Sequence, residues 1–423
     1  MAIPGAESLG VSPFVVMQFS LAMYALLYWH KHGIMIPIKW KWFTFWFLAF
    51  TVISLVSAFT FPFLFDGMRV YTPRGGVDPQ YLNPGVLEFS VSNIAQALYL
   101  FLYATGVLIF ITRFNTALFE ATNRAYLFAG IFVCFFSYYQ LISVVTGIYY
   151  PDEILYNNAN FDLAGERSIS FLPRIYSTFS ESSFYAIFMA SFLAWVYVKF
   201  VNEPDKSRSY RWLGLLICTM FSLLISTSST GFVTVALFFI LHTLSSLFLG
   251  SGRMQKGRIT FILSSFVFIL LALYFFVPNV DSILNEIIFD KGTSESSLHR
   301  FEADRFAFVV FFKTYLLGSG LGSNRPSSFF AFLVSNVGVL GTFCIAVSIL
   351  ILYLMSFRAV RSSAADASYK VTCQASGWAL FVILLAKVLG GPDLNFPPMW
   401  ILVGYFILSI MQLEAGPKKI KTV

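Results

Sequence analysis

Eleven long apolar runs dominate this sequence of 423 residues and restrict what it can fold into. They occupy roughly 12–30, 42–65, 89–111, 125–148, 179–198, 212–228, 231–248, 259–277, 327–356, 372–389 and 398–413. A helix needs about 20 apolar residues to cross the hydrocarbon core of a bilayer. Only 12% of the residues are charged, against about 25% in an ordinary soluble domain. We therefore expect an all-α, polytopic membrane protein of about eleven transmembrane helices, with residues 1–423 forming a single domain.

The charges between these runs predict the topology. Eighteen of the 28 basic residues fall in one set of alternating loops, and sixteen of the 21 acidic residues fall in the other set. Basic loops stay in the cytoplasm, so the first set is predicted to be cytoplasmic. The N-terminus is then outside and the C-terminus inside, which requires an odd number of spans and agrees with eleven. For a net charge of +7 the location of the charges matters more than their sum, and we expect no nucleic-acid partner.

Two of the predicted non-cytoplasmic loops are long, about 149–180 and about 278–326, whereas the cytoplasmic loops are short. The stretch from Leu298 to Leu317 is charged in its first half and apolar in its second, which predicts a helix at the membrane surface or against the bundle. Large structured loops on one face indicate where a site is built. We therefore expect the chemistry on the non-cytoplasmic face.

Arg174 and Glu181 lie where the first long loop meets the fifth apolar run. An ionisable residue at or just inside the membrane boundary is costly and suggests a functional site. The alternative is an Arg–Glu pair that only closes the end of a helix.

Three further arginines, Arg300, Arg305 and Arg325, are predicted on the same face as Arg174. A guanidinium group binds phosphate oxygens in a bidentate fork and keeps its charge in any setting, so four of them favour a phosphate site. The alternative is that acidic residues on the same helix neutralise Arg300 and Arg305.

Other residues of the second long loop are weaker candidates. His299 is the one histidine on the predicted outer face and is either an acid/base group or a solvated loop residue. Gly318, Gly320 and Gly322 follow a helix, with a spacing that differs from a dinucleotide-binding loop. They predict a turn that lets backbone approach a partner or a substrate.

The sequence offers no pattern typical of a metal site. No pair of closely spaced carboxylates with metal-ligand spacing occurs in the outer loops, and the four cysteines form no Cys-x-x-Cys motif. We expect metal-independent chemistry and no cofactor.

Three short stretches resemble the O-antigen polymerase and O-antigen ligase superfamily (Wzy and WaaL). Arg174-Ile-Tyr-Ser-Thr-Phe-Ser-Glu181-Ser-Ser resembles its Arg-x-x-Gly-Thr-Phe-x-Glu-Pro-Asn motif, with Ser177 at the glycine. The stretch from Arg300 to Gly322 resembles its second loop, where an arginine precedes a helix and a Gly-x-Gly. Ser226-Thr-Ser-Ser-Thr-Gly231 resembles its Ser-x-Ser-Arg-Gly turn, with Thr230 in place of the arginine.

One departure separates the two branches of the superfamily. Ligases place a His-Asn-type pair about ten residues before a Gly-x-x-Gly. Here Gly338-Val-Leu-Gly341 is preceded at that spacing by Ser327-Ser328. The resemblance therefore favours a polymerase.

The resemblance implies a GT-C type glycosyltransferase in the bacterial inner membrane. Such an enzyme polymerises oligosaccharide repeat units carried on undecaprenyl diphosphate at the periplasmic face, amid membrane lipids and with a chain-length regulator as a possible partner. The implied diphosphate contacts are Arg174 and Arg300, with Arg305 second. Glu181 is the implied base for the acceptor hydroxyl, or else it orients Arg174. The remaining implied substrate contacts are Arg325, Tyr176, Ser177, His299, Gly318, Gly320 and Gly322.

Other functions remain open. A glycan ligase of the same superfamily is the nearest enzymatic alternative. A flippase for lipid-linked oligosaccharides would be expected to carry charges within its spans, which here are nearly uncharged. A non-enzymatic membrane scaffold would not need Arg174, Glu181 and Arg300 on a common face.

Overall fold

The computed structural model describes residues 13–71, 85–155, 174–248, 258–259 and 295–415. Over these ranges the elements run in the order α1 (Pro13–His32), η2 (Ile38–Trp40), α2 (Lys41–Leu64), β1 (Arg69–Val70), β2 (Gly85–Val86), α3 (Val91–Thr112), α4 (Thr116–Thr146), α5 (Asp152–Leu155), α6 (Ser182–Asn202), α7 (Lys206–Leu224), α8 (Ser229–Phe248), α11 (Glu295–Lys313), α12 (Phe329–Ser362), α13 (Ala367–Leu389) and α14 (Pro397–Ala415).

Among the described residues, eight helical segments are long and apolar enough to cross a membrane. They are Ile38–Leu64, Val91–Thr112, Thr116–Thr146, Ser182–Asn202, Ser229–Ser246, Phe329–Ser362, Ala367–Leu389 and Pro397–Ala415. These helices confirm an all-α membrane protein, but they do not reach the predicted count of eleven. The expected spans 12–30 and 212–228 are helical as α1 and α7 without belonging to the eight, and the expected span 259–277 lies outside the described residues.

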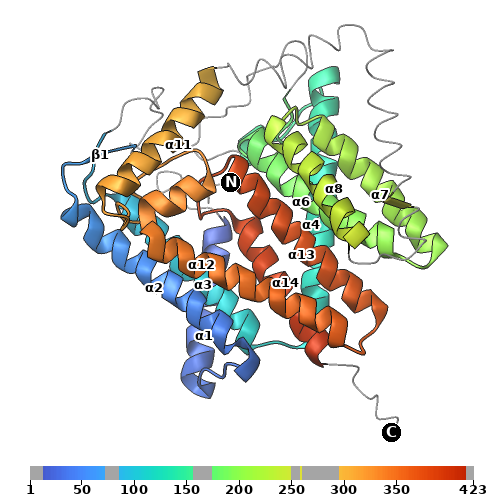
Figure 1. Ribbon diagram of the computed structural model, residues 1–423. Helices are drawn as coiled ribbons and strands as arrows, with labels where there is room; N and C mark the ends of the chain where they lie inside the picture. The colour runs from blue at the N-terminus through green and yellow to red at the C-terminus, as the bar shows by residue number, and fades with distance from the viewer. Residues whose placement is uncertain (1–12, 72–84, 156–173, 249–257, 260–294, 416–423) are drawn as a thin grey trace.

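Helix α6 is enclosed by other helices (Figure 1). Its sequence is apolar on all sides, which is typical of a buried helix, and nearly all of it is buried between α7, α8 and α13. It packs most extensively on α13, and the two helices are antiparallel. At one end Lys199 of α6 donates a hydrogen bond to Thr372 of α13, and at the other Ile187 lies against Gly391, just after α13 ends.

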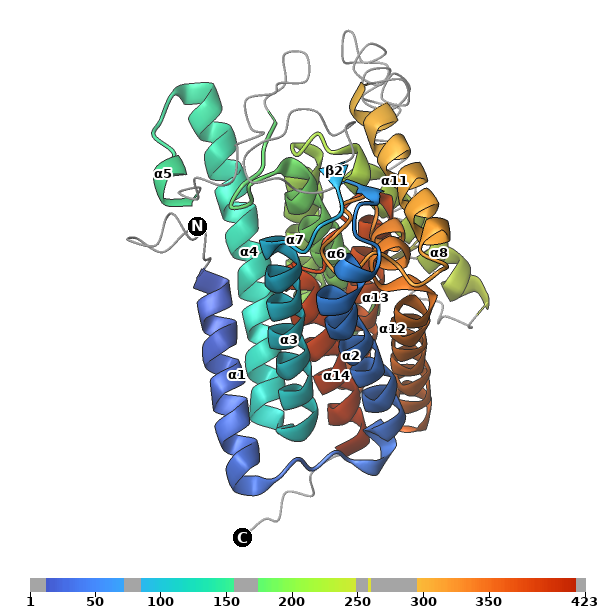
Figure 2. The same ribbon diagram turned by 90° about the vertical axis from the view of Figure 1, so that its left-hand side faces the viewer.

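The start of α6 and the end of α13 therefore share one end of the bundle. The starts of α8 and α12 lie there too, because the side chain of Thr230 and the carbonyl of Ser327 both contact the segment that follows α13. Figure 2 shows α11 and the short β1–β2 hairpin at this same end. We call it the α11 end of the bundle.

Helix α11 confirms the helix predicted between Leu298 and Leu317. It packs on α12, and Val310 forms a small apolar cluster with Val70 and Leu87 of the hairpin region. The helix ends at Lys313, and the backbone then takes the left-handed conformation at Tyr315 and Leu316 (φ 53° and 67°).

The segment Gly318–Asn324, which we call the glycine loop, is buried between helices. Its three glycines have φ angles of 86°, 104° and 88°, which residues with a side chain rarely adopt. A Cβ atom at these positions would lie 2.6–2.8 Å from backbone oxygen atoms of α12, α2 and α3 respectively. The glycines therefore allow the loop to pass between three helices at backbone contact.

Two asparagine side chains satisfy the backbone of this loop. Asn336 Oδ1 accepts hydrogen bonds from the N–H groups of Ser323 (3.1 Å) and Asn324 (3.0 Å), and its Nδ2 donates to the carbonyl of Asn324. Asn93 Nδ2 donates to the carbonyl of Leu321 (2.8 Å). Irregular backbone at membrane depth is stable only where such partners replace water.

We predict that Gly320→Ala destabilises the protein clearly more than Gly33→Ala. Both glycines have positive φ, so both substitutions introduce backbone strain of about 1–3 kcal/mol. Only at Gly320 does the new methyl group also meet protein atoms, with Ser57 O and Pro62 Cδ both at 2.8 Å, whereas nothing lies within 4 Å at Gly33. Thermal unfolding of the purified protein in detergent measures the difference. Equal midpoints for the two variants would contradict the close packing of the loop.

Candidate functional site

The α11 end of the bundle gathers most of the residues singled out from the sequence. Arg174 and Glu181 precede α6, Arg300 lies in α11, and Arg325 lies between the glycine loop and α12. The helices and strands around them meet at the end of the bundle seen at the top of Figure 2.

Arg174 is attached to the start of α6. Its Nε donates a hydrogen bond to the hydroxyl of Ser182, the first residue of the helix. Glu181 takes the N-cap position with extended backbone, but its carboxylate does not cap the helix. Glu181 is half-buried and lies at the positive end of the helix dipole, where negative charge is favoured. Its carboxylate makes no capping hydrogen bond with the helix.

Tyr176 and Ser177 form the turn between these two charged residues. The backbone N–H groups of both donate to Gln140 Oε1 of α4 (3.0 and 2.8 Å), and the buried hydroxyl of Ser177 donates to the carbonyl of Val133 (2.8 Å). Ser177 has a φ of 53°. The motif that this segment resembles has glycine at this position, and a positive φ gives the physical reason for that preference. The contacts of Ser177 thus hold the turn, and its predicted contact with substrate stays a prediction.

Arg300 meets two segments that are distant in the sequence. Its Nη1 lies 3.5 Å from the point where a Cβ of Gly390 would be, and Thr230 Oγ1 lies at the same distance from that point. The turn at Thr230 in turn packs on α6, because a Cβ at Gly231 would lie 2.9 Å from Ala186 Cβ. The three stretches that resemble the polymerase and ligase superfamily therefore converge at the α11 end.

The neighbours of Arg300 on α11 differ in their surroundings. His299 is half-buried, whereas Arg305 is exposed. Asp304 does not serve mainly as a partner for the arginines, because its Oδ1 accepts hydrogen bonds from the backbone N–H groups of Ser327 (2.7 Å) and Ser328 (2.9 Å). This carboxylate instead fixes the turn that leads into α12.

Glu302, the other acidic residue of α11 near the arginines, is exposed, and its carboxylate lies close enough to Tyr71 to affect the charge of the phenol group electrostatically. Burial, together with this nearby carboxylate, raises the pKa of Tyr71. The phenol group of Tyr71 is therefore neutral at physiological pH. Separately, the backbone carbonyl of Tyr71 accepts a hydrogen bond from the backbone N–H of Arg325 (2.8 Å).

The side chain of Arg325 points to the segment between α13 and α14. Its Nη2 lies 3.7 Å from Asp393 Oδ2. Gly318, Gly320 and Gly322, by contrast, are buried against other helices. The structure thus gives the glycines contacts with protein, and their predicted contact with substrate stays a prediction.

Lys387 is a cation of this region that the sequence interpretation did not single out. It lies in the last turn of α13, where its Nζ donates a hydrogen bond to the backbone carbonyl of Asp393 (2.7 Å). The signal in the sequence was a lone cation near the end of an apolar run, which by itself points to a functional residue.

Metal ligands do not gather in the described part of the chain. Over those residues, no group of three or more His, Cys, Asp or Glu side chains is arranged to hold a metal ion. The expectation of metal-independent chemistry stays a prediction.

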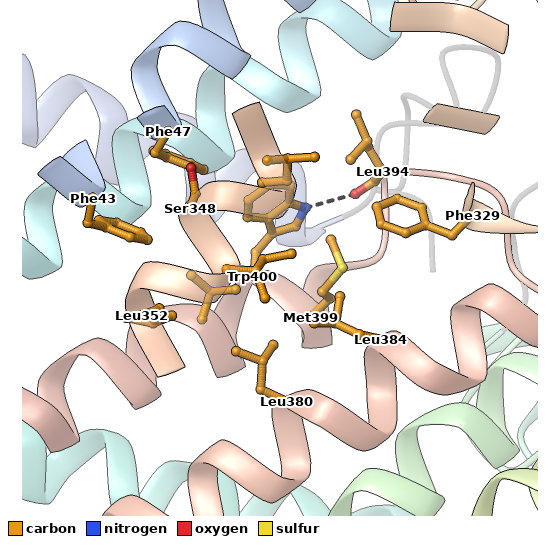
Figure 3. A pocket seen from close by; sticks show the side chains of 13 residues that line it. Phe43, Phe47, Phe329, Ser348, Leu352, Leu380, Leu384, Leu394, Met399 and Trp400 are labelled. Carbon is orange, nitrogen blue, oxygen red and sulfur yellow. Dashed lines mark hydrogen bonds between the residues drawn. The ribbon is translucent and has the colours of Figure 1, made fainter. Parts of the chain in front are cut away.

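A pocket deeper in the bundle is lined by apolar side chains of α2, α12, α13 and α14 (Figure 3). Phe43 and Phe47 lie on one side of it and Phe329 on the other, and Trp400 donates a hydrogen bond to the carbonyl of Leu394 at its edge (2.8 Å). The polar side-chain groups of the pocket are the Ser348 hydroxyl and the Trp400 indole N–H, which is already bonded, so the lining offers no charged group for phosphate chemistry. The charged cluster at the α11 end is therefore the better candidate site.

No protein-family model matches the sequence, and no curated protein matches it.

We predict that Ser177→Gly preserves folding and that Ser177→Val does not. Glycine adopts a φ of 53° without strain, whereas a β-branched residue in the left-handed region is strained by about 1–3 kcal/mol and would also bring two methyl groups into a fully buried position. Both variants lose the hydrogen bond to Val133, so they are matched in that respect. The yield of monodisperse protein after detergent extraction measures the outcome. Equal yields would contradict a conformational requirement at this turn.

Proposed function

We propose that the protein is a metal-independent GT-C type glycosyltransferase that polymerises oligosaccharide repeat units carried on undecaprenyl diphosphate. The observation that carries the proposal is the meeting of the Arg174–Glu181 segment, the Thr230 turn and Arg300 at one end of the bundle. These segments lie far apart in the sequence, and each resembles a motif of the same superfamily.

The proposed topology has eleven spans, with the N-terminus outside and the C-terminus in the cytoplasm. The α11 end then faces the periplasm of a bacterial inner membrane. This orientation is supported by the distribution of basic and acidic residues over alternating loops. A lipid-linked substrate could keep its tail in the bilayer there while its sugars reach water.

The proposed reaction transfers the growing glycan from its lipid diphosphate to a hydroxyl group of the incoming unit. The bond between the anomeric carbon and the diphosphate oxygen breaks, and a glycosidic bond forms. The proton of the acceptor hydroxyl passes to a base, and the diphosphate leaves as an anion. Since this leaving group is already good, catalysis needs positioning and charge stabilisation more than proton donation.

The roles of the residues follow from their positions. Arg174 and Arg300 contact the diphosphate, with Arg305, which is exposed, as a secondary contact. Glu181 is the base, or else it orients Arg174. A chain-length regulator is a proposed partner. A glycan ligase is less well supported, because Ser327 and Ser328, at the ligase His-Asn positions, offer no imidazole and have their backbone N–H groups bound by Asp304.

Surface polysaccharide from a deletion strain tests this function. A polymerase defect abolishes long chains but leaves a single repeat unit on the lipid core. Loss of every repeat unit would instead identify a ligase or a flippase and overturn the proposal.

We predict that Arg174→Ala and Arg300→Ala each abolish long-chain polymer while the protein level stays normal. The corresponding lysine variants restore little, because a point charge does not reproduce the two-pronged contact of a guanidinium group with phosphate. Gel analysis of polysaccharide from complemented deletion strains measures the effect. Arg208→Ala is the control, since Arg208 is an exposed arginine in the first turn of α7 that pairs with Asp205, the N-cap residue of that helix. Full-length polymer from both alanine variants would exclude the arginine clamp.

We predict that Glu181→Gln lowers polymer synthesis by roughly 100-fold or more if the carboxylate is the base, because a positioned general base contributes about 10²–10⁴ in rate. The amide cannot accept the proton, but it keeps the size and hydrogen-bonding capacity of the side chain. Initial rates with purified lipid-linked repeat units measure the change. A rate within a few-fold of the unsubstituted protein would assign Glu181 to the orientation of Arg174 instead.

A further inference from the structure

Lys387 is held in a closed environment at the end of α13. Lys387 is only 1% exposed to solvent. The ammonium group lies over the rings of Phe329 and Phe396, 5.2 and 5.1 Å from their centroids, and it donates to the backbone carbonyl of Asp393. The side chain is thus fixed in position rather than free to reach out to water.

The chain folds back over this lysine. Gly391 has a φ of 148°, and a Cβ there would lie 3.7 Å from Lys387 Cγ and 3.3 Å from Ile187 Cδ1. The N–H of Gly391 donates to the carbonyl of Ser327 (3.0 Å), which ties the segment to the start of α12. The segment after α13 therefore encloses Lys387 between α6 and α12.

A buried ammonium group is costly unless its charge and its three N–H donors are compensated. The aromatic rings compensate part of the charge, and the Asp393 carbonyl takes one donor. The carboxylate of Asp393 lies 3.7 Å from Arg325, so this acidic side chain already has another cation as its ion-pair partner. Among the described residues, the contacts of Lys387 thus leave it short of negative charge.

The surrounding charges strengthen this imbalance. Arg300 adds a third cation beside Gly390. Asp304 is engaged by two backbone N–H groups of the turn into α12. Among the described charged side chains that contact the segment after α13, three are the cations Lys387, Arg300 and Arg325, and the carboxylate is that of Asp393 itself. This local excess of cations favours a bound anion with more than one negative charge.

We propose that Lys387 is a further anion-binding residue of the candidate site. Without ligand, the Asp393 carboxylate pairs with Arg325. A phosphate-bearing ligand displaces this carboxylate and binds Arg325 in its place. The identification of this ligand as a lipid diphosphate rests on the proposed function. The lysine then approaches the anion from α13, whereas Arg300 approaches it from α11.

A purely structural role for Lys387 predicts a different result. If the lysine only held the segment after α13, loss of either Lys387 or Asp393 would loosen that segment and weaken ligand binding. If Asp393 instead competes with the ligand, its neutralisation strengthens binding while loss of Lys387 weakens it. The two substitutions therefore have opposite signs only under the proposal.

The experiment titrates farnesyl diphosphate, and separately inorganic pyrophosphate, into the purified full-length protein in detergent. We expect Lys387→Met, whose side chain suits the aromatic surroundings, to raise the Kd for both probes by roughly tenfold. Asp393→Asn lowers the Kd, and Arg208→Ala leaves it unchanged. A greater affinity for farnesyl diphosphate than for pyrophosphate indicates a lipid-borne diphosphate, and equal affinities indicate that the head group alone is recognised; either supports an anion site. Thermal unfolding without ligand confirms that each variant is folded.

Three outcomes overturn the proposal: an unchanged Kd for Lys387→Met, weaker binding for Asp393→Asn, or no binding of either probe by the unsubstituted protein. The proposed function fails separately. If the deletion strain keeps its long polymer but Lys387→Met still loses diphosphate binding, the anion site stands and the polymerase assignment falls. If Arg300→Ala loses both polymer and binding while Lys387→Met binds normally, only the role of Lys387 is excluded.

Discussion

The antiparallel packing of α6 on α13 determines where the candidate site lies. Because one helix starts where the other ends, the Arg174–Glu181 segment before α6 and the Lys387–Asp393 segment around the end of α13 are brought to the same end of the bundle. Both helices are largely buried, so neither shifts without disturbing their neighbours. Arg300 of α11 and Thr230 of α8 then reach the same place by contact with Gly390.

Irregular backbone beside this site is stabilised by buried amides. The glycine loop passes between three helices, and its N–H and carbonyl groups are bound by Asn336 and Asn93 in place of water. Within α12, Gly338 has a positive φ of 67° and interrupts the helical conformation at the point where its backbone contacts that of Leu317. The loop thus works as a rigid support under Arg325, and this arrangement favours a preorganised site over one formed by a mobile loop.

Charge is distributed unevenly at the α11 end. Asp304 accepts hydrogen bonds from backbone N–H groups. The Asp393 carboxylate pairs with Arg325, and the backbone carbonyl of Asp393 accepts a hydrogen bond from Lys387. An excess of fixed cations near a membrane boundary is costly, and an anionic ligand offsets that cost. This physical argument for an anionic ligand does not depend on the motif resemblance.

The sequence by itself determined the class of fold and the face on which function is expected. Apolar run length and loop charge are local properties, and they predicted the helices, including α11, and the grouping of Arg174, Glu181 and Arg300. Only the tertiary structure decided that Asp304 anchors the start of α12, that the three glycines contact helices, and that Lys387 belongs with the arginines. These roles depend on which distant helices become neighbours, and that choice is made by side-chain packing between segments, which no local pattern records.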